Sequence, residues 1–371
     1  MDTDSDLDIF LVTIPGLESL LCAEAVEKGF RTPVPETGGV TVKGDWSEVW
    51  RANLELRGAS KVLVRIGAFR VLHLAQLDKR ARRFPWGDIL RADVPVHVEA
   101  ACKSSRIYHA GAAAQRIARA IHEELGAPIA RDGDVRIMAR IVDDLCTLSI
   151  DSSGEGLHKR GHKLAVSKAP LRETLASLFL RQCRYDGQEP VVDPMCGSGT
   201  FVIEAAEIAA GLQPGRSRAF AFERLVTFDE TIWQGLHKSP HALTPPVRFW
   251  GYDRDAGAIE MSCANAERSG VAAVTAFRVQ PVSALTAPDG PPGLVIVNPP
   301  YGARIGSTKD LVPLYRSLGQ RLGEHFSGWR VGLVTSADAL AKATKLPFSQ
   351  ESGPISHGGL RIKVYTTNPL R

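Results

Sequence analysis

The chain has 371 residues, of which 44% are hydrophobic and 23% charged, and its formal net charge is +4. The length allows two or three domains of ordinary size, and the composition is that of a globular protein. Because the sequence shows neither a signal peptide nor an apolar run of about 20 residues, we expect no membrane insertion and a cytoplasmic location.

The cysteines are scattered and include no Cys-x-x-Cys pair. They stand at positions 22, 102, 146, 183, 196 and 263. This spacing argues against a zinc site and against a disulfide framework, and it indicates reduced thiols. We therefore expect no bound metal.

Residues 1–65 alternate between strand and helix patterns. Residues 9–13 predict a strand, and Pro15-Gly16 predicts a turn into a helix that ends near Gly29. The residues expected on the apolar face of this helix are Leu17, Leu20, Leu21 and Val26. Further strands are expected at 39–42 and 62–66, and a helix at 46–53. These elements predict a small α+β module.

Residues 66–155 are more basic. Cations stand beside aromatic residues in one short stretch, formed by Lys79, Arg80, Arg82, Arg83, Phe84 and Trp86. Such interleaving is typical of a phosphate-contacting surface, although any one of these cations could simply face solvent. The elements expected here are a strand at 96–100, a helix at 110–125, and strands at 135–141 and 146–150.

A basic segment follows at residues 157–163, Leu-His-Lys-Arg-Gly-His-Lys. His158 and His162 are four residues apart, which would suit a metal on a helix. Nearby glycines argue against a helix, however, and no carboxylate has suitable spacing. The segment is interpreted as a basic linker, which could be an ordinary connection.

The rest of the chain alternates strands with helices. A helix is expected at 169–180, and residues 191–204 read as strand, glycine turn and helix, the first unit of a doubly wound sheet. Gly197 and Gly199 allow a tight turn and a close ligand approach, although tight turns need glycine in any case. The later strands are expected at 248–253, 276–279, 294–297, 331–335 and 360–365, the last of them antiparallel. Helices are expected at 256–269 and 311–325, and an insertion at 211–247.

The apolar run 294–297 ends in Asn298-Pro299-Pro300-Tyr301. Two prolines make this a rigid loop at a strand end, which could be only a stiff turn. The Asn298 side-chain oxygen and the Pro299 carbonyl can also accept both protons of an exocyclic amine. Tyr301 offers a flat face on which a flipped base can stack.

Together, Asp-Pro-Met-Cys-Gly-Ser-Gly-Thr at 193–200 and Asn-Pro-Pro-Tyr at 298–301 resemble S-adenosylmethionine-dependent methyltransferases that act on exocyclic amines of bases. These two sequences are similar to those of the THUMP-domain RNA guanine-N2 methyltransferases. Bacterial members of that family modify large-subunit ribosomal RNA. The resemblance implies an α/β architecture. It comprises a ferredoxin-like module (1–65), a THUMP RNA-binding domain (66–155) and a Rossmann-like class I methyltransferase domain (156–371).

The resemblance also implies a cofactor site for S-adenosylmethionine. The turn that would wrap its methionine portion comprises Asp193, Pro194, Met195, Cys196, Gly197, Ser198, Gly199 and Thr200. Asp253, at the end of the second strand, is placed to bind the ribose hydroxyls. Thr174 and Asn298 complete the predicted set. An aspartate usually follows the third strand and accepts from the adenine amine, but this chain has Gln280.

The predicted RNA contacts are Lys103, Arg106 and Tyr108, in a turn that matches a THUMP pattern, and Lys159 and Arg160 in the linker. His162-Lys163 stands where the family has Tyr-Arg.

The reaction expected is transfer of a methyl group to the N2 amine of a flipped guanine, with Asn298, Pro299, Pro300 and Tyr301 as catalytic residues. The favoured substrate is 23S ribosomal RNA, with transfer RNA as the alternative. Other interpretations are methylation of adenine N6 or of DNA, and a non-catalytic RNA-binding protein with a degenerate fold. The glycine spacing disfavours a dehydrogenase.

Overall fold

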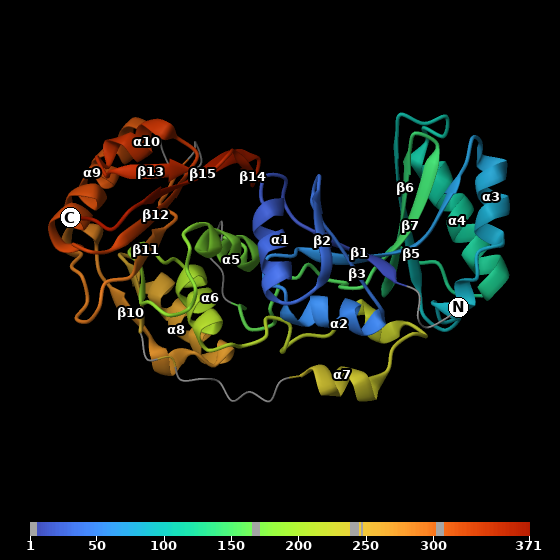
Figure 1. Cartoon of the computed structure of the whole chain (residues 1–371), viewed down its shortest axis with the longest axis horizontal. Helices are drawn as coiled ribbons and strands as arrows, with labels where there is room; N and C mark the ends of the chain where they lie inside the picture. The colour runs from blue at the N-terminus through green and yellow to red at the C-terminus, as the bar shows by residue number, and fades with distance from the viewer. Residues whose placement is uncertain (1–5, 165–170, 238–244, 246–247, 302–307) are drawn as a thin grey trace. The chain divides into compact units, whose positions relative to one another are not determined.

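The computed structural model describes residues 6–164, 171–237, 245, 248–301 and 308–371, with no account of the side chain of residue 308. The chain forms two compact units (Figure 1). The first comprises residues 1–13, 21–157 and 218–238, and the second comprises 14–20, 158–217 and 239–371. Each is described by itself.

The first unit contains one large sheet and helices. Its strands are β1 (Leu7–Val12), β2 (Arg31–Glu36), β3 (Gly39–Gly44), β4 (Lys61–Arg70), β5 (Val96–Lys103), β6 (Val135–Val142) and β7 (Leu145–Asp151). Its helices are α1 (Glu18–Glu27, which begins in residues grouped with the second unit), α2 (Trp46–Glu55), α3 (Leu74–Arg82), α4 (Ala110–Leu125) and α7 (Glu230–Leu236), with 3-10 turns at Trp86–Asp88 and Ala221–Arg224.

This sheet has the order β2-β3-β1-β4-β7-β6-β5, and its neighbours are antiparallel except for the parallel pair β5–β6. β4 pairs with β1 on one side and with β7 on the other. The predicted boundary between residues 65 and 66 therefore falls inside β4, and a single sheet passes through both predicted modules.

One local expectation for the first unit was wrong, and one strand was missed. Val26 is 60% exposed, whereas α1 buries the predicted Leu21 together with Ala25. The strand β2 was missed because its two prolines argue against a strand. The prolines are tolerated because β2 is the edge strand of the sheet. There, a backbone N–H that proline lacks can be one that would face solvent and not a neighbouring strand.

The inserted residues 218–238 belong to the first unit, although the sequence analysis kept them in the third domain. Their aromatic side chains pack on α2. Phe222 stacks on Trp50 with ring centroids 6.0 Å apart, and Trp233 meets Phe222 edge-on at 5.0 Å. The aromatic residues of the insertion therefore complete the core of the first unit.

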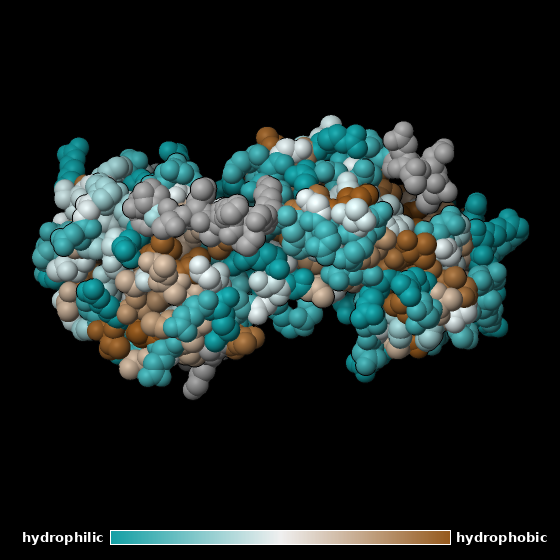
Figure 2. Space-filling view, turned by 90° about the horizontal axis from the view of Figure 1, so that it is seen from below, coloured by the Kyte–Doolittle hydropathy of each residue, from teal (hydrophilic) through white to brown (hydrophobic). Residues whose placement is uncertain are grey.

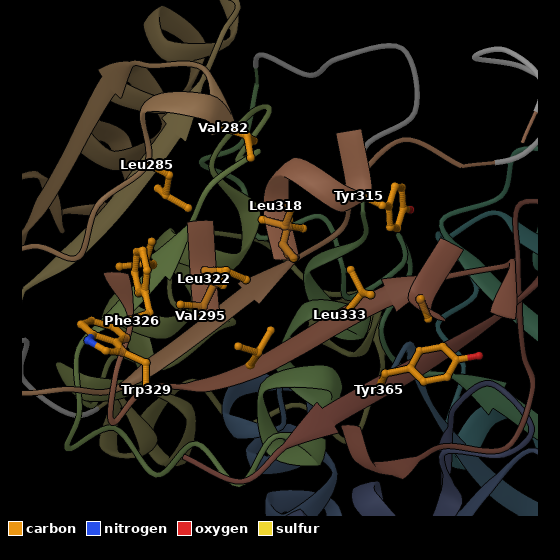
Figure 3. Packing of buried hydrophobic residues seen from close by; sticks show 14 of the residues in the cluster. Val282, Leu285, Val295, Tyr315, Leu318, Leu322, Phe326, Trp329, Leu333 and Tyr365 are labelled. Atoms are coloured by element: carbon orange, nitrogen blue, oxygen red, sulfur yellow. The ribbon is translucent and has the colours of Figure 1, made fainter. Parts of the chain in front are cut away.

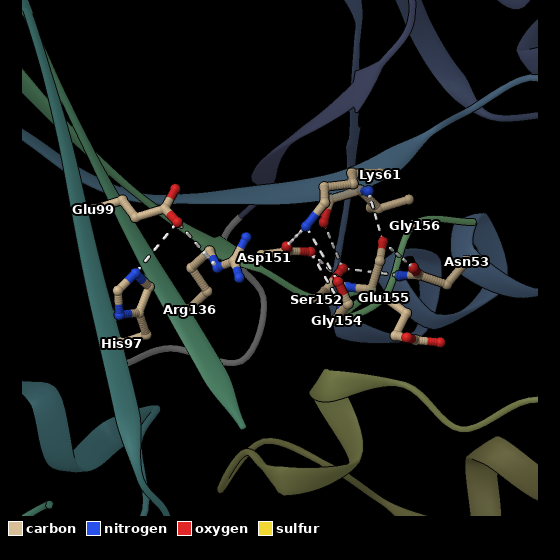
Figure 4. A network of polar contacts seen from close by, with 12 residues as sticks. Asn53, Lys61, His97, Glu99, Arg136, Asp151, Ser152, Gly154, Glu155 and Gly156 are labelled. Atoms are coloured by element: carbon tan, nitrogen blue, oxygen red, sulfur yellow. Dashed lines mark hydrogen bonds and ion pairs between the residues drawn. The ribbon is translucent and has the colours of Figure 1, made fainter. Parts of the chain in front are cut away.

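A polar network ties the end of β7 to β4 and α2 (Figure 4). Lys61 pairs with the buried Asp151, and its ammonium also donates to the Gly154 carbonyl at 3.1 Å. Asn53 donates to the Ser152 hydroxyl at 2.9 Å and accepts from the Ser153 hydroxyl at 2.6 Å. The segment that leads out of the sheet is thus held by buried hydrogen bonds.

The second unit is also built on a sheet. Its strands are β8 (Val191–Asp193), β9 (Phe249–Asp253), β10 (Thr275–Val279), β11 (Leu294–Val297), β12 (Arg330–Thr335), β13 (Phe348–Glu351), β14 (Ile355–His357) and β15 (Leu360–Thr367). Its helices are α5 (Glu173–Gln182), α6 (Thr200–Ala209), α8 (Ala256–Ser269), α9 (Thr308–His325) and α10 (Asp338–Ala343), with 3-10 turns at Ala272–Val274 and Val282–Ala284.

The strand order is β10-β9-β8-β11-β12-β15-β13, and β14 pairs with β15. The first five strands are parallel, and β15 is antiparallel to β12, as the sequence predicts. β13, β14 and α10 were not predicted, because these segments are short. Residues 169 and 170 of the helix expected at 169–180 lie outside the described residues.

β11 is buried on both faces, as its uninterrupted apolar sequence predicts. Val295 and Val297 belong to a cluster with Leu318 and Leu322 of α9 and with Leu333 of β12 (Figure 3). This packing holds α9 against the strands that carry the predicted catalytic loop.

Hydrophilic residues cover much of the face seen in Figure 2, with hydrophobic residues between them. Within the described ranges, no helix combines the length and the apolar character that a membrane crossing needs.

Candidate functional site

The predicted site lies at the switch point of the second sheet. From β8 the chain proceeds to β9 and β10 on one side, and β11 and β12 lie on the other side. Ligands of open α/β sheets bind outside the carboxyl ends of the strands at such a point. Asp193 ends β8 and Asn298 follows β11, so the two sequence motifs meet at adjacent strand ends.

The turn between β8 and α6 is braced from α8. Gly197 and Gly199 have φ angles of 54° and 83°, in the left-handed region that glycine tolerates. The Ser262 hydroxyl donates to the Gly197 carbonyl at 2.9 Å, and the Asn265 amide donates to the Ser198 carbonyl at 3.1 Å. Two buried side chains of one helix thus set the path of the turn.

Gly199 is required for space as well as for φ. A Cβ atom there would lie 3.1 Å from the Ser262 hydroxyl oxygen and 3.2 Å from a methyl carbon of Ile203. Cys196 is also placed by its surroundings, since its N–H donates to the Tyr252 carbonyl at 2.9 Å. Burial raises the pKa of the Cys196 thiol well above its usual value, so this thiol stays protonated, which fits a packing role.

Two carboxyl groups flank the turn. Asp253 accepts from the Gly197 N–H at 3.0 Å, and Asp193 accepts from the Met195 N–H at 3.0 Å. Burial, together with the nearby charge of Asp253, raises the pKa of Asp193 to about 8, although the Met195 hydrogen bond opposes this shift. A cation that bound beside these groups would favour the ionised form of Asp193.

Gln280 lies next to Asp253. Its backbone N–H donates to the Asp253 carbonyl at 2.8 Å, and its side-chain amide donates to the Ala284 carbonyl at 3.1 Å. That bond uses an amide proton, so the side-chain oxygen keeps its capacity to accept. The structure therefore brings the predicted adenine-side residue to the same strand edge as the predicted ribose-binding acid.

Thr174 is 4% exposed in the first turn of α5. Lys163 joins this region to the glycine turn. Its ammonium donates to the Thr200 hydroxyl at 2.7 Å and to the Leu171 carbonyl at 3.1 Å, and it lies 3.0 Å from a carboxylate oxygen of Glu173. Lys163 was predicted only as part of a basic linker and not as part of the site, because its contact with Thr200 depends on the tertiary structure.

The Asn298 side-chain oxygen is buried and, within the described part of the chain, accepts no hydrogen bond. Such an atom is costly unless a ligand satisfies it. In the same ranges no group donates to the Pro299 carbonyl, whereas the Pro300 carbonyl accepts from Tyr315 of α9 at 3.2 Å. Tyr301 is partly buried against the α9 cluster, and burial raises the pKa of its phenol to about 12.

The linker residues do not all face solvent. Lys159 is exposed, but Arg160 is 2% exposed and lies 3.3 Å from Glu204 of α6. Its burial leaves no surface for an RNA contact, so Arg160 anchors the linker to the second unit instead. Lys159 and Arg160 were both predicted as RNA contacts, but the burial of Arg160 could not be read from a glycine-rich stretch without periodicity.

His162 is also buried, in contact with Glu207, and burial lowers its pKa. In the described ranges, no group of three or more His, Cys, Asp or Glu side chains is arranged to hold a metal ion.

The predicted RNA-binding turn lies at the surface of the first unit. Tyr108 is 84% exposed, and the Arg106 side chain is 70% exposed. The turn is held by the β6–β7 hairpin, since the Arg106 N–H donates to the Asp144 carboxylate at 2.8 Å and the Asp144 N–H donates to the Ser105 hydroxyl at 3.1 Å. Lys103, Arg106 and Tyr108 therefore project from a braced backbone.

The basic-aromatic stretch near residue 80 is different. Trp86 is 2% exposed and donates to the Ala81 carbonyl at 2.8 Å, so it belongs to the core. Arg82 pairs with Asp78, Glu123 and Glu124. Neither side chain is free to contact phosphate, which corrects the prediction for these two residues.

A cleft of about 920 Å³ is present elsewhere in the second unit, between α9 and the chain following β15. No predicted site residue lines it. Its location is therefore no guide to the chemistry at the switch point.

The strand order, the switch point and the two motifs define the class I methyltransferase fold. Family comparison agrees with this assignment. Residues 160–354, more than half of the chain, match the model described as RMKL-like, methyltransferase domain, and residues 8–63 match the RlmL ferredoxin-like domain. The chain belongs to the RMKL-like methyltransferase-domain family, which confirms the family resemblance and the α/β fold class.

Individual relatives support this placement. The chain is 34% identical to "Ribosomal RNA large subunit methyltransferase K/L" of Psychromonas ingrahamii, over 98% of the chain and 51% of the relative. The chain thus spans about half the length of the curated relatives it matches.

Solved structures also match this chain over nearly their whole lengths. A possible methylase from Clostridium difficile 630 has a TM-score of 0.88 at 26% identity, covering 99% of both chains. A predicted N6-adenine-specific DNA methylase from Listeria monocytogenes has a TM-score of 0.88 at 27% identity, covering 98% of this chain and 97% of that one.

Proposed function

We propose that this protein transfers a methyl group from S-adenosylmethionine to the N2 amine of a guanine in 23S ribosomal RNA. The observation that carries the proposal is the buried side-chain oxygen of Asn298, which has no hydrogen-bond partner in the described ranges. This oxygen lies at the switch point of a methyltransferase fold. The name of the Psychromonas relative supports ribosomal RNA as the substrate class.

The residues present fit the cofactor. The cofactor would supply an electrophilic sulfonium methyl group. Gly197 and Gly199 lack the Cβ atoms that would obstruct approach to the turn backbone, and Asp253 can accept from ribose hydroxyls. The proposed cofactor site also includes Thr174, Gln280 and the remaining residues of 193–200. The neutral Gln280 can still accept a hydrogen bond from an adenine amine.

The catalytic loop would act by orientation. Asn298 Oδ1 and the Pro299 carbonyl accept the two protons of the amine, which directs its lone pair toward the methyl group. Correct placement of reacting atoms lowers the barrier without any acid–base pair. Tyr301 would stack on the flipped base, and the surplus proton would leave to water.

The first unit would supply the RNA contacts. Lys103, Arg106 and Tyr108 combine two cations and an exposed ring on one braced turn, and such a surface binds phosphates and unpaired bases. Exposed Lys159, in the linker grouped with the second unit, would supply a further cation. In this proposal residues 66–155 act as a THUMP module beside the ferredoxin-like residues 1–65, and the second unit carries the chemistry. With ribosomal RNA as substrate, we expect the protein to act in the cytoplasm.

The test is incubation of the protein with labelled S-adenosylmethionine and separate pools of undermodified ribosomal and transfer RNA, followed by nucleoside analysis. Labelled N2-methylguanine in the ribosomal pool alone is expected. Label in transfer RNA would overturn the substrate class, and no label together with no cofactor binding would support a degenerate, RNA-binding fold.

The RNA-binding surface has its own test. The double variant Lys103→Ala/Arg106→Ala should weaken RNA binding. It should also reduce the slope of log affinity against log salt by about one for each phosphate that the protein no longer neutralises. Lys28→Ala, which removes an exposed cation elsewhere in the first unit, is the matched control and should leave the slope unchanged.

A second candidate is methylation of adenine N6, since the loop accepts any exocyclic amine. The name of the Listeria neighbour favours this alternative. The same nucleoside digest distinguishes the two, because N6-methyladenine and N2-methylguanine separate chromatographically.

A further inference from the structure

The Tyr315 side chain lies entirely within the core of the second unit, yet its hydroxyl meets two polar groups. It belongs to α9 and packs beside Leu318 in the cluster of Figure 3. Its oxygen lies 3.2 Å from the Pro300 carbonyl oxygen and 3.3 Å from the hydroxyl oxygen of Thr335, the last residue of β12. Tyr315 therefore connects the catalytic loop to the neighbouring strand.

The hydrogen atoms in these contacts can be assigned by counting donors. The Pro300 carbonyl can only accept, so the single phenolic hydrogen of Tyr315 must be donated to it. The Thr335 hydroxyl must then donate to the Tyr315 oxygen, and the Thr335 oxygen accepts from the Ala337 N–H at 3.3 Å. One directed chain runs from Ala337 through Thr335 and Tyr315 to Pro300.

We infer that Tyr315 is a positioning residue for methyl transfer. Its hydrogen bond fixes the Pro300 carbonyl and so the direction of the neighbouring acceptors, Asn298 Oδ1 and the Pro299 carbonyl. The inference rests on the proposed function of Asn298 and Pro299. By occupying the Pro300 carbonyl, Tyr315 leaves the Pro299 carbonyl as the acceptor that faces substrate.

The burial of the two hydroxyls agrees with this role. Because Thr335 is 1% exposed and Tyr315 is fully buried, water does not compete for either hydroxyl. The chain is thus a stiff support within the core.

Tyr315→Phe removes the terminal donor while keeping the ring in the core. We expect kcat to fall about tenfold, since a small misplacement of reacting groups is costly. The Kd for S-adenosylmethionine and the KM for RNA should stay within about twofold. Thr335→Val should produce a similar fall in kcat, and Thr335→Ser, which keeps the hydroxyl, should restore it. The double variant Tyr315→Phe/Thr335→Val should be no slower than Tyr315→Phe, because both residues act through one chain.

Tyr185→Phe is the matched control. Tyr185 is also a buried phenol that donates to a backbone carbonyl, but this acceptor, at 2.9 Å, belongs to Ala205 of α6 and not to the catalytic loop. This variant should lose comparable stability and keep the wild-type kcat. Equal kcat for Tyr315→Phe and wild type would overturn the inference, as would a loss of cofactor binding that parallels the loss of rate.

Hydrogen exchange of the peptide Leu294–Tyr301 separates this inference from the proposed function. Tyr315→Phe should speed exchange of the amides of Asn298 and Tyr301, whereas Tyr185→Phe should not. Should the wild-type protein methylate no RNA, the proposed function fails, and unchanged exchange would then refute the inference independently.

Discussion

The turn at 193–200 and the loop at 298–301 lie at the ends of adjacent strands, but their polar groups are satisfied differently. In the turn, the carbonyls of Gly197 and Ser198 accept hydrogen bonds from two side chains of α8. The Asp253 carboxylate accepts a hydrogen bond from the Gly197 N–H. In the loop, the Asn298 side-chain oxygen is buried without a partner in the described part of the chain.

This difference separates two roles. A turn whose backbone is already hydrogen-bonded can receive a cofactor without reorganising. The residues of such a turn are therefore constrained by the backbone shape that they must adopt. A loop that leaves the Asn298 side-chain oxygen unsatisfied retains a site for the substrate at some cost in stability. The loop should therefore control the rate, whereas the turn should control cofactor affinity and folding.

Asn298→Ala should have the largest effect. Methyl transfer should fall by about a hundredfold or more, because the amine loses an orienting acceptor, as when one oriented catalytic group is removed elsewhere. The Kd for S-adenosylmethionine, measured by calorimetry, should change little. Asn368→Ala, at an exposed amide of the same unit, serves as control. Full activity of Asn298→Ala would refute the role of the loop.

Gly199→Ala tests the shape of the turn. We expect a loss of about 2 kcal/mol in unfolding free energy, since Ala would adopt a left-handed φ and crowd Ser262. Urea denaturation measures this loss. Gly211→Ala is the control, because Gly211 also has a positive φ of 65° but nothing within 4 Å of an added Cβ. Equal losses for both variants would show that Ser262 exerts no steric constraint.

Cofactor affinity should depend on pH through Asp193. Its pKa is raised to about 8 in the free protein, and a bound sulfonium would lower it. The proton must therefore leave on binding below pH 8, so affinity should increase as pH rises toward 8 and level off above it. Each unit of pKa change corresponds to about tenfold in affinity.

Calorimetry in two buffers of different ionisation enthalpy would detect the released proton. The variant Asp193→Asn should release none and should flatten the pH profile. An unchanged profile in that variant would assign the dependence to another group.

Ser262→Ala should have the smallest effect, a loss of about 1 kcal/mol in unfolding free energy, since one buried hydrogen bond to the Gly197 carbonyl disappears. Thermal or urea unfolding measures it, and kcat at saturating cofactor should not change. Ser269→Ala, whose hydroxyl bonds to the Ala266 carbonyl of its own helix, is the control. A fall in kcat for Ser262→Ala would contradict the proposal that the loop controls the rate and the turn controls cofactor affinity and folding.

Several features of this protein could be predicted from the sequence because they depend on local patterns. Apolar runs that end in Asp193 and Asn298 identified two strands, and in a parallel sheet the ends of such strands meet at one edge. Glycines at 197 and 199 indicated a turn, and the turn does place both in the left-handed region. A last antiparallel strand was also predicted at 360–365, and β15 is antiparallel to β12.

Only the tertiary structure decided which polar groups are buried and paired. Arg160 and Lys163 have the same local sequence character as Lys159, but α5 and α6 bury the first two and leave the third in solvent. The hydrogen-bond chain through Tyr315 joins residues that are far apart in the sequence. Such contacts depend on helix packing against the sheet, because side-chain burial is set by neighbours distant along the chain, which no local pattern encodes.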